Sequence, residues 1–145
     1  MNREEVRAFT HELFEDVVRG DLHNLGAKLD DDIDWIFHAP VAIFPCAGAL
    51  RGRRAVLASM MDLARDYQIE RQVLETVVAD KDRSAALTDV ALTQRATGRM
   101  VRLRVAHIHR FRDRKLVEYR GFTDSFDATE QVLGRWLDLA PPPQA

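Results

Sequence analysis

Residues 100–111, MVRLRVAHIHRF, are the stretch from which the fold of this chain is most clearly predicted. Arg102 and Arg104 stand at even positions, whereas the odd positions are mostly apolar. The odd positions hold Val101, Leu103, Val105, His107, His109 and Phe111. Because successive side chains of a strand point to opposite faces, this period of two predicts a long β-strand with one mostly apolar face and one mostly basic face.

Three further segments have the same period and lie on either side of this strand. They are residues 69–79, 85–95 and 116–124. Short polar turns separate neighbouring segments, as in antiparallel hairpins. Four sequential strands with such connections predict an antiparallel meander, and its apolar face must be covered by helices.

In much of the remaining chain, apolar residues recur at the spacing of an α-helix. Asn2 followed by Glu5 resembles a capping box, and Gly20 is a typical stop for a first helix that ends near Arg19. Further helices are predicted over residues 22–29, 52–66 and 127–139. The other segments are predicted as a turn (30–32), a short strand (33–37) and a loop with a brief strand (41–50).

The bulk composition is that of one globular α+β domain. The chain has 145 residues, of which 46% are hydrophobic and 30% charged. No repeat or linker interrupts residues 1–140, which we interpret as a single domain. The Pro-rich residues 141–145 are predicted to form a disordered tail.

Net charge, cysteine content and hydropathy exclude several classes of partner and location. The net charge is −2 and the arginines are scattered among acids, which argues against nucleic acid as a partner. A lone Cys46 excludes an internal disulfide and a thiolate metal cluster, and it is consistent with a reducing compartment. Neither a signal peptide nor a membrane-spanning run is present, so we expect a cytoplasmic protein without membrane insertion.

Four motifs together resemble a known family. They are residues 34–40 (DWIFHAP), 47–53 (AGALRGR), 106–113 (AHIHRFRD) and 118–124 (EYRGFTD). Their order and spacing resemble the nuclear-transport-factor-2-like superfamily, and more narrowly its SnoaL-like polyketide-cyclase and ketosteroid-isomerase-like branch, over about residues 3–139. The resemblance implies a cone in which N-terminal helices pack on a strongly bent antiparallel or mixed sheet around an apolar pocket. It also implies a homodimer formed through the sheet.

The chain departs from the ketosteroid isomerases at their catalytic positions. The general-base aspartate falls at Ala39, the oxyanion tyrosine near Leu13 and the oxyanion carboxylic acid at His107. Steroid isomerisation by that mechanism is therefore excluded. Limonene-epoxide-hydrolase-like members need an Asp-Arg-Asp set, of which only Asp124 has a counterpart here.

Two residues are candidates for acid-base chemistry. In cyclase-like relatives an aspartate at the end of the last strand acts as general acid or base, which the resemblance assigns to Asp124. His107 shares a face with Val105, so its imidazole is expected to point into the interior, where it could relay a proton or hold a substrate oxygen. The structural alternatives are that Asp124 caps the last helix and that His107 hydrogen-bonds a core partner.

Five residues are candidates for ligand contacts. They are Trp35, Phe37, His38, Val105 and Phe122. Trp35 and Phe37 share one face of the first strand, where the family lines its pocket, and two large rings favour a flat apolar ligand. Core packing would explain both rings equally well, and strand parity puts His38 on the opposite face.

No metal or cofactor is predicted. His109 follows His107 by two, but no third ligand has a suitable spacing, and no phosphate-binding glycine loop or nucleophile motif occurs. Two functions stay open: a cofactor-free isomerase, cyclase or lyase acting on a small apolar compound through Asp124 and His107, or a non-catalytic ligand-binding or dimeric interaction module. The first requires both side chains to reach one cavity.

Overall fold

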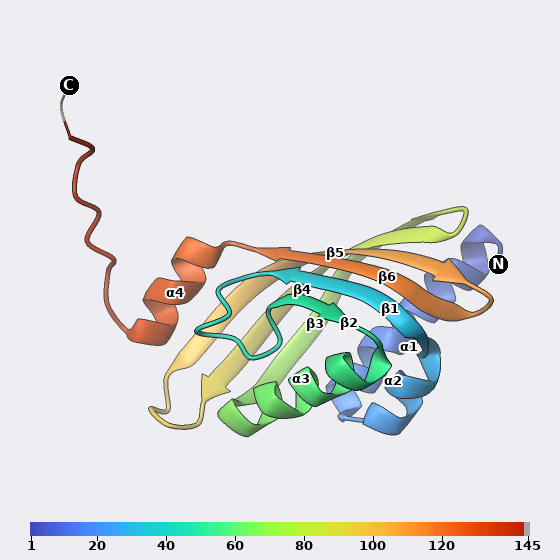
Figure 1. Ribbon diagram of the computed structural model, residues 1–145, viewed down its shortest axis with the longest axis horizontal. Coiled ribbons are helices and arrows are strands. Elements are labelled where there is room, and N and C mark those ends of the chain that lie inside the picture. The colour runs from blue at the N-terminus through green and yellow to red at the C-terminus, as the bar shows by residue number, and fades with distance from the viewer. Residues whose placement is uncertain (144–145) are drawn as a thin grey trace.

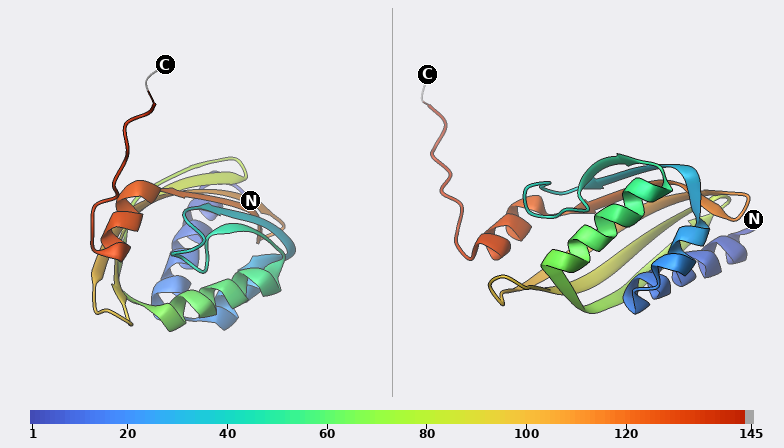
Figure 2. Two further views of the ribbon diagram at one scale, coloured as in Figure 1. Left: turned by 60° about the vertical axis from the view of Figure 1, so that its left-hand side comes forward. Right: turned by 60° about the horizontal axis from the view of Figure 1, so that its bottom comes forward.

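A curled six-stranded sheet forms one wall of the molecule in the computed structural model, which describes residues 1–143 (Figure 1). The strands lie in the order β2-β1-β6-β5-β4-β3. They are β1 (Leu29–His38), β2 (Gly48–Arg51), β3 (Tyr67–Asp80), β4 (Arg83–Gln94), β5 (Met100–Arg112) and β6 (Lys115–Thr123). The sheet is curled but not closed (Figure 2).

Three helices lie under the concave face of the sheet, and a fourth packs at its far end (Figures 1 and 2). The four are α1 (Arg3–Arg19), α2 (Leu22–Lys28), α3 (Arg53–Asp66) and α4 (Ser125–Leu133). The helices are held on one side because the concave face carries the apolar side chains of the long strands. The predicted α+β cone is thereby confirmed.

The predicted antiparallel meander is confirmed for β3, β4, β5 and β6. The N-terminal strand joins it differently, because β1 pairs parallel with β6 and antiparallel with β2. The sheet is therefore mixed. In this arrangement Trp35 of β1 is the direct neighbour of Tyr119 of β6.

The alternation that predicted β5 is seen in full. Val101, Leu103, Val105, His107 and His109 are buried on the concave face, whereas Arg102 and Arg104 are exposed on the other. The arginines are paired across strands, Arg102 with Asp89 and Arg104 with Glu75. These ion pairs neutralise much of the predicted basic face.

The first helix begins and ends as predicted. Asn2 and Glu5 form a reciprocal capping box, and Gly20 takes a left-handed conformation with φ 67° at the C-terminal end.

Two predicted boundaries are wrong. Residues 30–32 are part of β1 and not a turn, because β1 continues through an irregularity in its pairing with β6. The last helix begins after Asp124 and ends at Leu133, where Gly134 turns left-handed with φ 69°. The helix predicted to reach residue 139 therefore stops six residues earlier, and the chain leaves the domain as an extended segment (Figure 1).

The predicted tail at 141–145 is described only to residue 143, and residues 144 and 145 lie outside the described part. Within residues 1–143, no helix is both long and apolar enough to cross a membrane.

Candidate functional site

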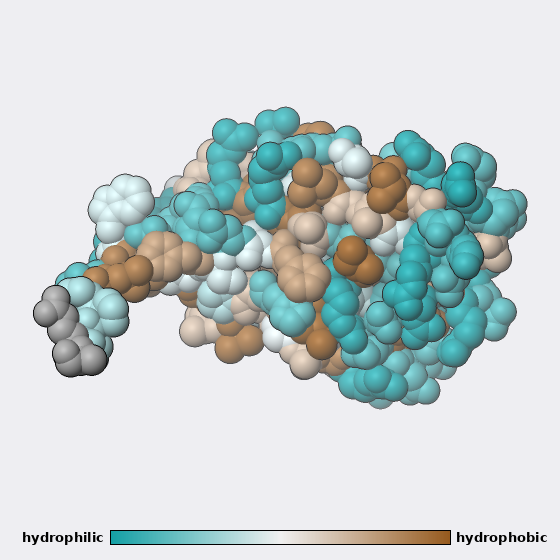
Figure 3. Space-filling view, turned by 90° about the horizontal axis from the view of Figure 1, so that it is seen from above, coloured by the Kyte–Doolittle hydropathy of each residue, from teal (hydrophilic) through white to brown (hydrophobic). Residues whose placement is uncertain are grey.

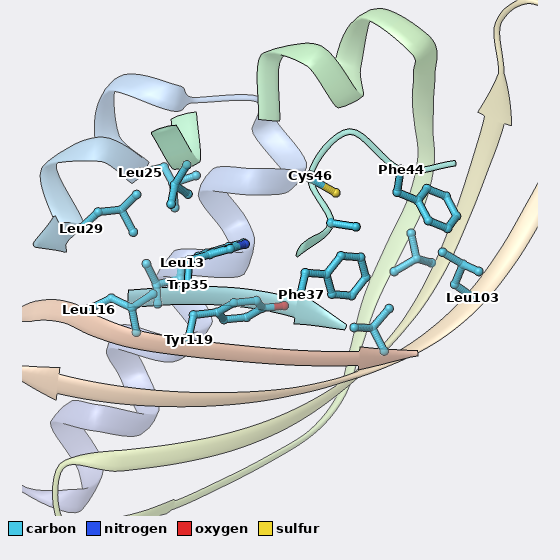
Figure 4. Packing of buried hydrophobic residues seen from close by; sticks show 14 of the residues in the cluster. Leu13, Leu25, Leu29, Trp35, Phe37, Phe44, Cys46, Leu103, Leu116 and Tyr119 are labelled. Atoms are coloured by element: carbon cyan, nitrogen blue, oxygen red, sulfur yellow. The ribbon is translucent and has the colours of Figure 1, made fainter. Parts of the chain in front are cut away.

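A cavity of about 280 Å³ lies between the concave face of the sheet and helices α1 to α3. Its walls are mostly apolar and come from every part of the cone, including the loop between β1 and β2 (Figure 4). Lining residues from these parts include Leu13, Leu25, Trp35, Phe37, Phe44, Cys46, Met60, Leu103, Val105, His107, His109 and Tyr119. The cone thus encloses real space and is not filled by its own side chains.

Polar side chains are gathered on the sheet wall of this cavity. His107 and His109 come from β5, and Tyr119 comes from the neighbouring β6, where it pairs with His109. Nδ1 of His107 lies 2.7 Å from the Tyr119 hydroxyl oxygen, and its Nε2 lies 2.9 Å from Oγ1 of Thr88. Both ring nitrogens of His107 are therefore engaged by hydroxyl groups.

Either direction of these two hydrogen bonds leaves one hydroxyl proton without an acceptor among residues 1–143. Thr88 has no exposed surface, and His107 is the only side-chain partner of its hydroxyl within residues 1–143. If Nε2 of His107 donated to Thr88, the hydroxyl proton of Thr88 would be buried without an acceptor, which is unfavourable. If instead Thr88 donates to Nε2 and Nδ1–H of a neutral His107 donates to the Tyr119 oxygen, the hydroxyl proton of Tyr119 is the one without an acceptor. Tyr119 lines the cavity, so in this second arrangement an acceptor within the cavity can pair the remaining proton.

His109 belongs to a second chain of hydrogen bonds. Thr10 donates its single proton to the carbonyl of Val6 at 2.7 Å, so Ser84 must donate to Thr10 at 2.8 Å. Ser84 then accepts from Nδ1–H of His109 at 3.1 Å. This chain fixes the ring of His109 against β4 and α1.

Burial keeps these groups neutral. It lowers the pKa of His107 to about 4. Burial, together with the neighbouring His107, lowers the pKa of His109 to about 3. Burial also raises the pKa of Tyr119, and it raises the pKa of the Cys46 thiol to about 12. At neutral pH the cavity therefore holds imidazoles, a phenol and a thiol without charge.

The position of the Tyr119 ring depends on a glycine two residues further along β6. A Cβ atom at Gly121 would lie 2.3 Å from the Tyr119 hydroxyl oxygen and 2.7 Å from Cδ2 of Phe37. Because Gly121 lacks this atom, the ring of Tyr119 can lie over it. The other face of the phenol stacks on Trp35, with ring centroids 3.8 Å apart and planes inclined by 24°.

Four of the seven predicted site residues line the cavity. They are Trp35, Phe37, Val105 and His107. Their placement follows from strand parity, because each stands on the concave side of its strand.

The other three lie outside it. Asp124 is exposed and caps α4, where its side chain accepts a hydrogen bond from the Asp127 amide at 3.0 Å. His38 and Phe122 are exposed neighbours on the convex face, with ring centroids 4.6 Å apart. The expected meeting of His107 and Asp124 in one cavity does not occur, because β6 ends before Asp124 and the parity of Phe122 is that of the outer face.

Comparison with known proteins identifies the family. A model of the SnoaL-like domain matches residues 3–119, which is most of the chain. The chain belongs to the SnoaL-like family. No curated protein matches it.

Several solved structures share the SnoaL-like cone. The protein from Rhodopseudomonas palustris named "Putative Isomerase" is 32% identical with a TM-score of 0.78, covering 88% of this chain and 94% of its own. An NTF2-like protein from Burkholderia xenovorans is 22% identical with a TM-score of 0.79, covering 91% and 98%. An LEH-like epoxide hydrolase from M. tuberculosis is 15% identical with a TM-score of 0.74, covering 91% and 92%. The last two establish likeness of fold alone.

The cavity of this SnoaL-like protein contains polar residues that sequence reasoning missed. Thr88 and Tyr119 were not candidates, and the parity of β6 left open whether Tyr119 or Arg120 faces inward. Arg120 pairs with Asp34 on the outside, at 2.9 Å, which leaves Tyr119 inside. Tyr119 stands between two charged residues, Glu118 and Arg120, and this alternation was the available signal that Tyr119 faces inward.

Within the described part of the chain, no three His, Cys, Asp or Glu side chains are arranged to hold a metal ion. The closely spaced His107 and His109 are instead engaged by Thr88, Tyr119 and Ser84.

Proposed function

We propose that this SnoaL-like protein binds a small, largely apolar molecule in the cavity between its sheet and helices. The observation that carries the proposal is the cavity itself, about 280 Å³ in volume and lined mainly by Leu, Val, Phe and Trp side chains. Voids in close-packed interiors are few and seldom larger than a water molecule, whereas ligand pockets begin near 300 Å³. A space of this size is expected to hold a ligand and not to result from imperfect packing.

Turnover of the ligand is a second candidate function. The observation in its favour is the hydrogen bond between His107 and Tyr119, which could move a proton to or from a bound molecule. The name of the R. palustris relative, "Putative Isomerase", also supports turnover. The protein would then be a cofactor-free isomerase, cyclase or lyase.

Binding is nevertheless the function we favour. Both ring nitrogens of His107 are already engaged, and its pKa of about 4, caused by burial, makes it a weak base at neutral pH. Asp124, the other predicted catalytic residue, caps a helix in solvent. No carboxylate of residues 1–143 lines the cavity.

A variant that fills the cavity tests the proposal. Leu103 lines the cavity, whereas Arg102 is exposed on the opposite face of β5. Leu103→Trp therefore adds an indole inside the cavity, and Arg102→Trp adds one on the outer surface of the sheet. A panel of small apolar compounds would be screened by thermal shift and native mass spectrometry. We expect hits with wild type and Arg102→Trp that Leu103→Trp loses. Equal binding to a folded Leu103→Trp, or no hit with wild type, would contradict the proposal.

We also propose that two copies associate through the convex face of the sheet, as a homodimer. Apolar side chains there lie among the paired arginines (Figure 3). Phe122 is 46% exposed, Ile108 37% and Val78 59%. Ile108 and Val78 lie on either side of Ala85, which pairs with both of them across neighbouring strands. A cytoplasmic location is part of the same proposal, supported by the reduced, buried Cys46.

A further inference from the structure

We infer that the bound molecule carries an uncharged oxygen acceptor, such as a ketone carbonyl, which accepts hydrogen bonds from Nε1–H of Trp35 and from the hydroxyl of Tyr119. The inference rests on the proposed binding function and adds the chemical class of the ligand. Three features of the cavity support it: an unpaired indole donor, a phenol whose donation to an acceptor completes the hydrogen bonds of Thr88 and His107, and the lack of charge around them.

The indole nitrogen of Trp35 is the first feature. Trp35 is only 8% exposed and lines the cavity. Its Nε1 is the one fully buried side-chain nitrogen or oxygen without a hydrogen-bond partner within residues 1–143. Buried indole N–H groups usually find an acceptor, because an unpaired buried donor loses its bonds to water. An acceptor on a bound molecule would satisfy it.

The phenol of Tyr119 supplies the second donor. With an acceptor in the cavity, Thr88 can donate to His107, His107 to the Tyr119 oxygen and Tyr119 to the acceptor, so that all three protons are paired. In this arrangement the chain of hydrogen bonds from Thr88 through His107 polarises the phenol and strengthens its donation.

The two donors belong to neighbouring, stacked side chains. Trp35 and Tyr119 are paired in the register of β1 and β6, and their rings stack at 3.8 Å. In Figure 4 the Trp35 nitrogen and the Tyr119 oxygen both point along the cavity in the direction of Phe37. A ligand that lies beside Phe37 would therefore present its oxygen to this pair.

The oxygen must belong to an uncharged group. No Lys or Arg of the described residues lines the cavity, and the imidazoles are neutral because burial lowers the pKa of both. A carboxylate or phosphate would lose its hydration without gaining a counter-charge, whereas a ketone loses far less.

A matched pair of ligands tests the inference. The ketone 2-decalone and the hydrocarbon 2-methylidenedecalin have nearly the same shape and differ by an oxygen in place of a CH₂ group. Their Kd values would be measured for wild type, Trp35→Phe, Tyr119→Phe and the apolar control Phe37→Leu. The ratio of the two Kd values is the readout, because a change in cavity shape affects both ligands alike.

We expect Trp35→Phe and Tyr119→Phe each to weaken the ketone about 5- to 10-fold relative to the hydrocarbon. Phe37→Leu should leave the ratio unchanged. A ratio unaffected by both ring variants would overturn the inference while leaving the binding function intact. Wild type that binds neither compound would overturn both. If Trp35→Phe does not fold, Tyr119→Phe decides.

A spectroscopic readout reports on Trp35 directly. The chain has two tryptophans, and the other, Trp136, is 84% exposed in the segment after α4. In a Trp136→Phe background, the ultraviolet resonance Raman bands of Trp35 report the hydrogen bonding of its indole. The ketone should shift them toward a hydrogen-bonded indole and the hydrocarbon should not, and the same spectrum with both would contradict the assignment.

Discussion

His107 and Tyr119 join two neighbouring strands of the sheet through a hydrogen bond of 2.7 Å between Nδ1 and the phenol oxygen. The bond lies on the sheet wall of a mostly apolar cavity, and Thr88 contacts the other ring nitrogen of the imidazole. Whether the Tyr119 proton points into the cavity therefore depends on the direction of the hydrogen bond between His107 and Thr88, a residue on β4 that is itself completely buried.

Removal of the Thr88 hydroxyl should destabilise the fold. Thr88→Val keeps the shape of the side chain but leaves Nε2 of His107 without a partner, so we expect the free energy of unfolding to fall by about 1–3 kcal/mol. Chemical denaturation measures this. Thr93→Val on the same strand is the control, because among residues 1–143 the Thr93 hydroxyl bonds only to the exposed Glu70, and its change should stay within about 0.5 kcal/mol. Equal effects of the two substitutions would contradict the hydrogen-bond chain.

Acid should destabilise the protein through His107. Burial lowers the pKa of His107 to about 4 in the folded state, whereas an unfolded histidine has a pKa of about 6.5. Between these values the unfolded chain binds the extra proton, so stability falls as the pH decreases from about 6.5 to about 4. Above about pH 6.5 His107 is neutral in both the folded and the unfolded chain, so it adds no pH dependence to the free energy of unfolding.

The size of this effect is on the order of 3 kcal/mol for His107. The measurement is the free energy of unfolding against pH for wild type and His107→Gln. The variant should lose part of the slope between pH 4 and 6.5, whereas His23→Gln, at an exposed position on α2, should retain it. An unchanged slope in His107→Gln would show that the imidazole is hydrated in the folded state.

A methyl group at position 121 should displace Tyr119. The Cβ atom of Gly121→Ala would lie 2.3 Å from the Tyr119 oxygen, which forces the ring or the strand to move. We expect a loss of about 1–3 kcal/mol in stability and weaker ligand binding. Gly26→Ala in α2 is the control, because its Cβ would meet flexible side chains alone, with Cδ1 of Leu57 at 3.0 Å and Cδ of Arg53 at 3.9 Å. Ligand affinity that survives in a folded Gly121→Ala would show that Tyr119 does not need this position.

A charge on the convex face should separate the proposed dimer. Ile108→Glu places a carboxylate among the exposed apolar side chains of that face, and we expect it to weaken association at least about 100-fold. Sedimentation velocity over a range of concentrations measures this. Val41→Glu, in the exposed loop after β1, should leave association unchanged. Wild type that sediments as a monomer at about 100 μM would refute the dimer.

Local patterns were sufficient to determine most of the architecture. The alternation in residues 100–111, the capping box at Asn2 and Gly20 after the first helix each depend on neighbours in the chain. Side-chain direction along a strand follows from parity alone, so the inward positions of His107, Val105, Trp35 and Phe37 were predictable. For the same reason the outward position of Phe122 could have been inferred from Tyr119 three residues earlier.

Only the tertiary structure decided which groups meet in the cavity. The parallel pairing of β1 with β6 places Trp35 on Tyr119, and the register of β4 with β5 brings Thr88 to His107. The first pairing joins residues far apart in the chain, and the second depends on the register of the β4–β5 hairpin, neither of which the period of two specifies. The end of β6 before Asp124 is a similar case, because a capping aspartate and a catalytic one look alike in sequence. Their difference lies in whether the carboxylate faces water or an enclosed apolar space, which the packing of the whole cone determines.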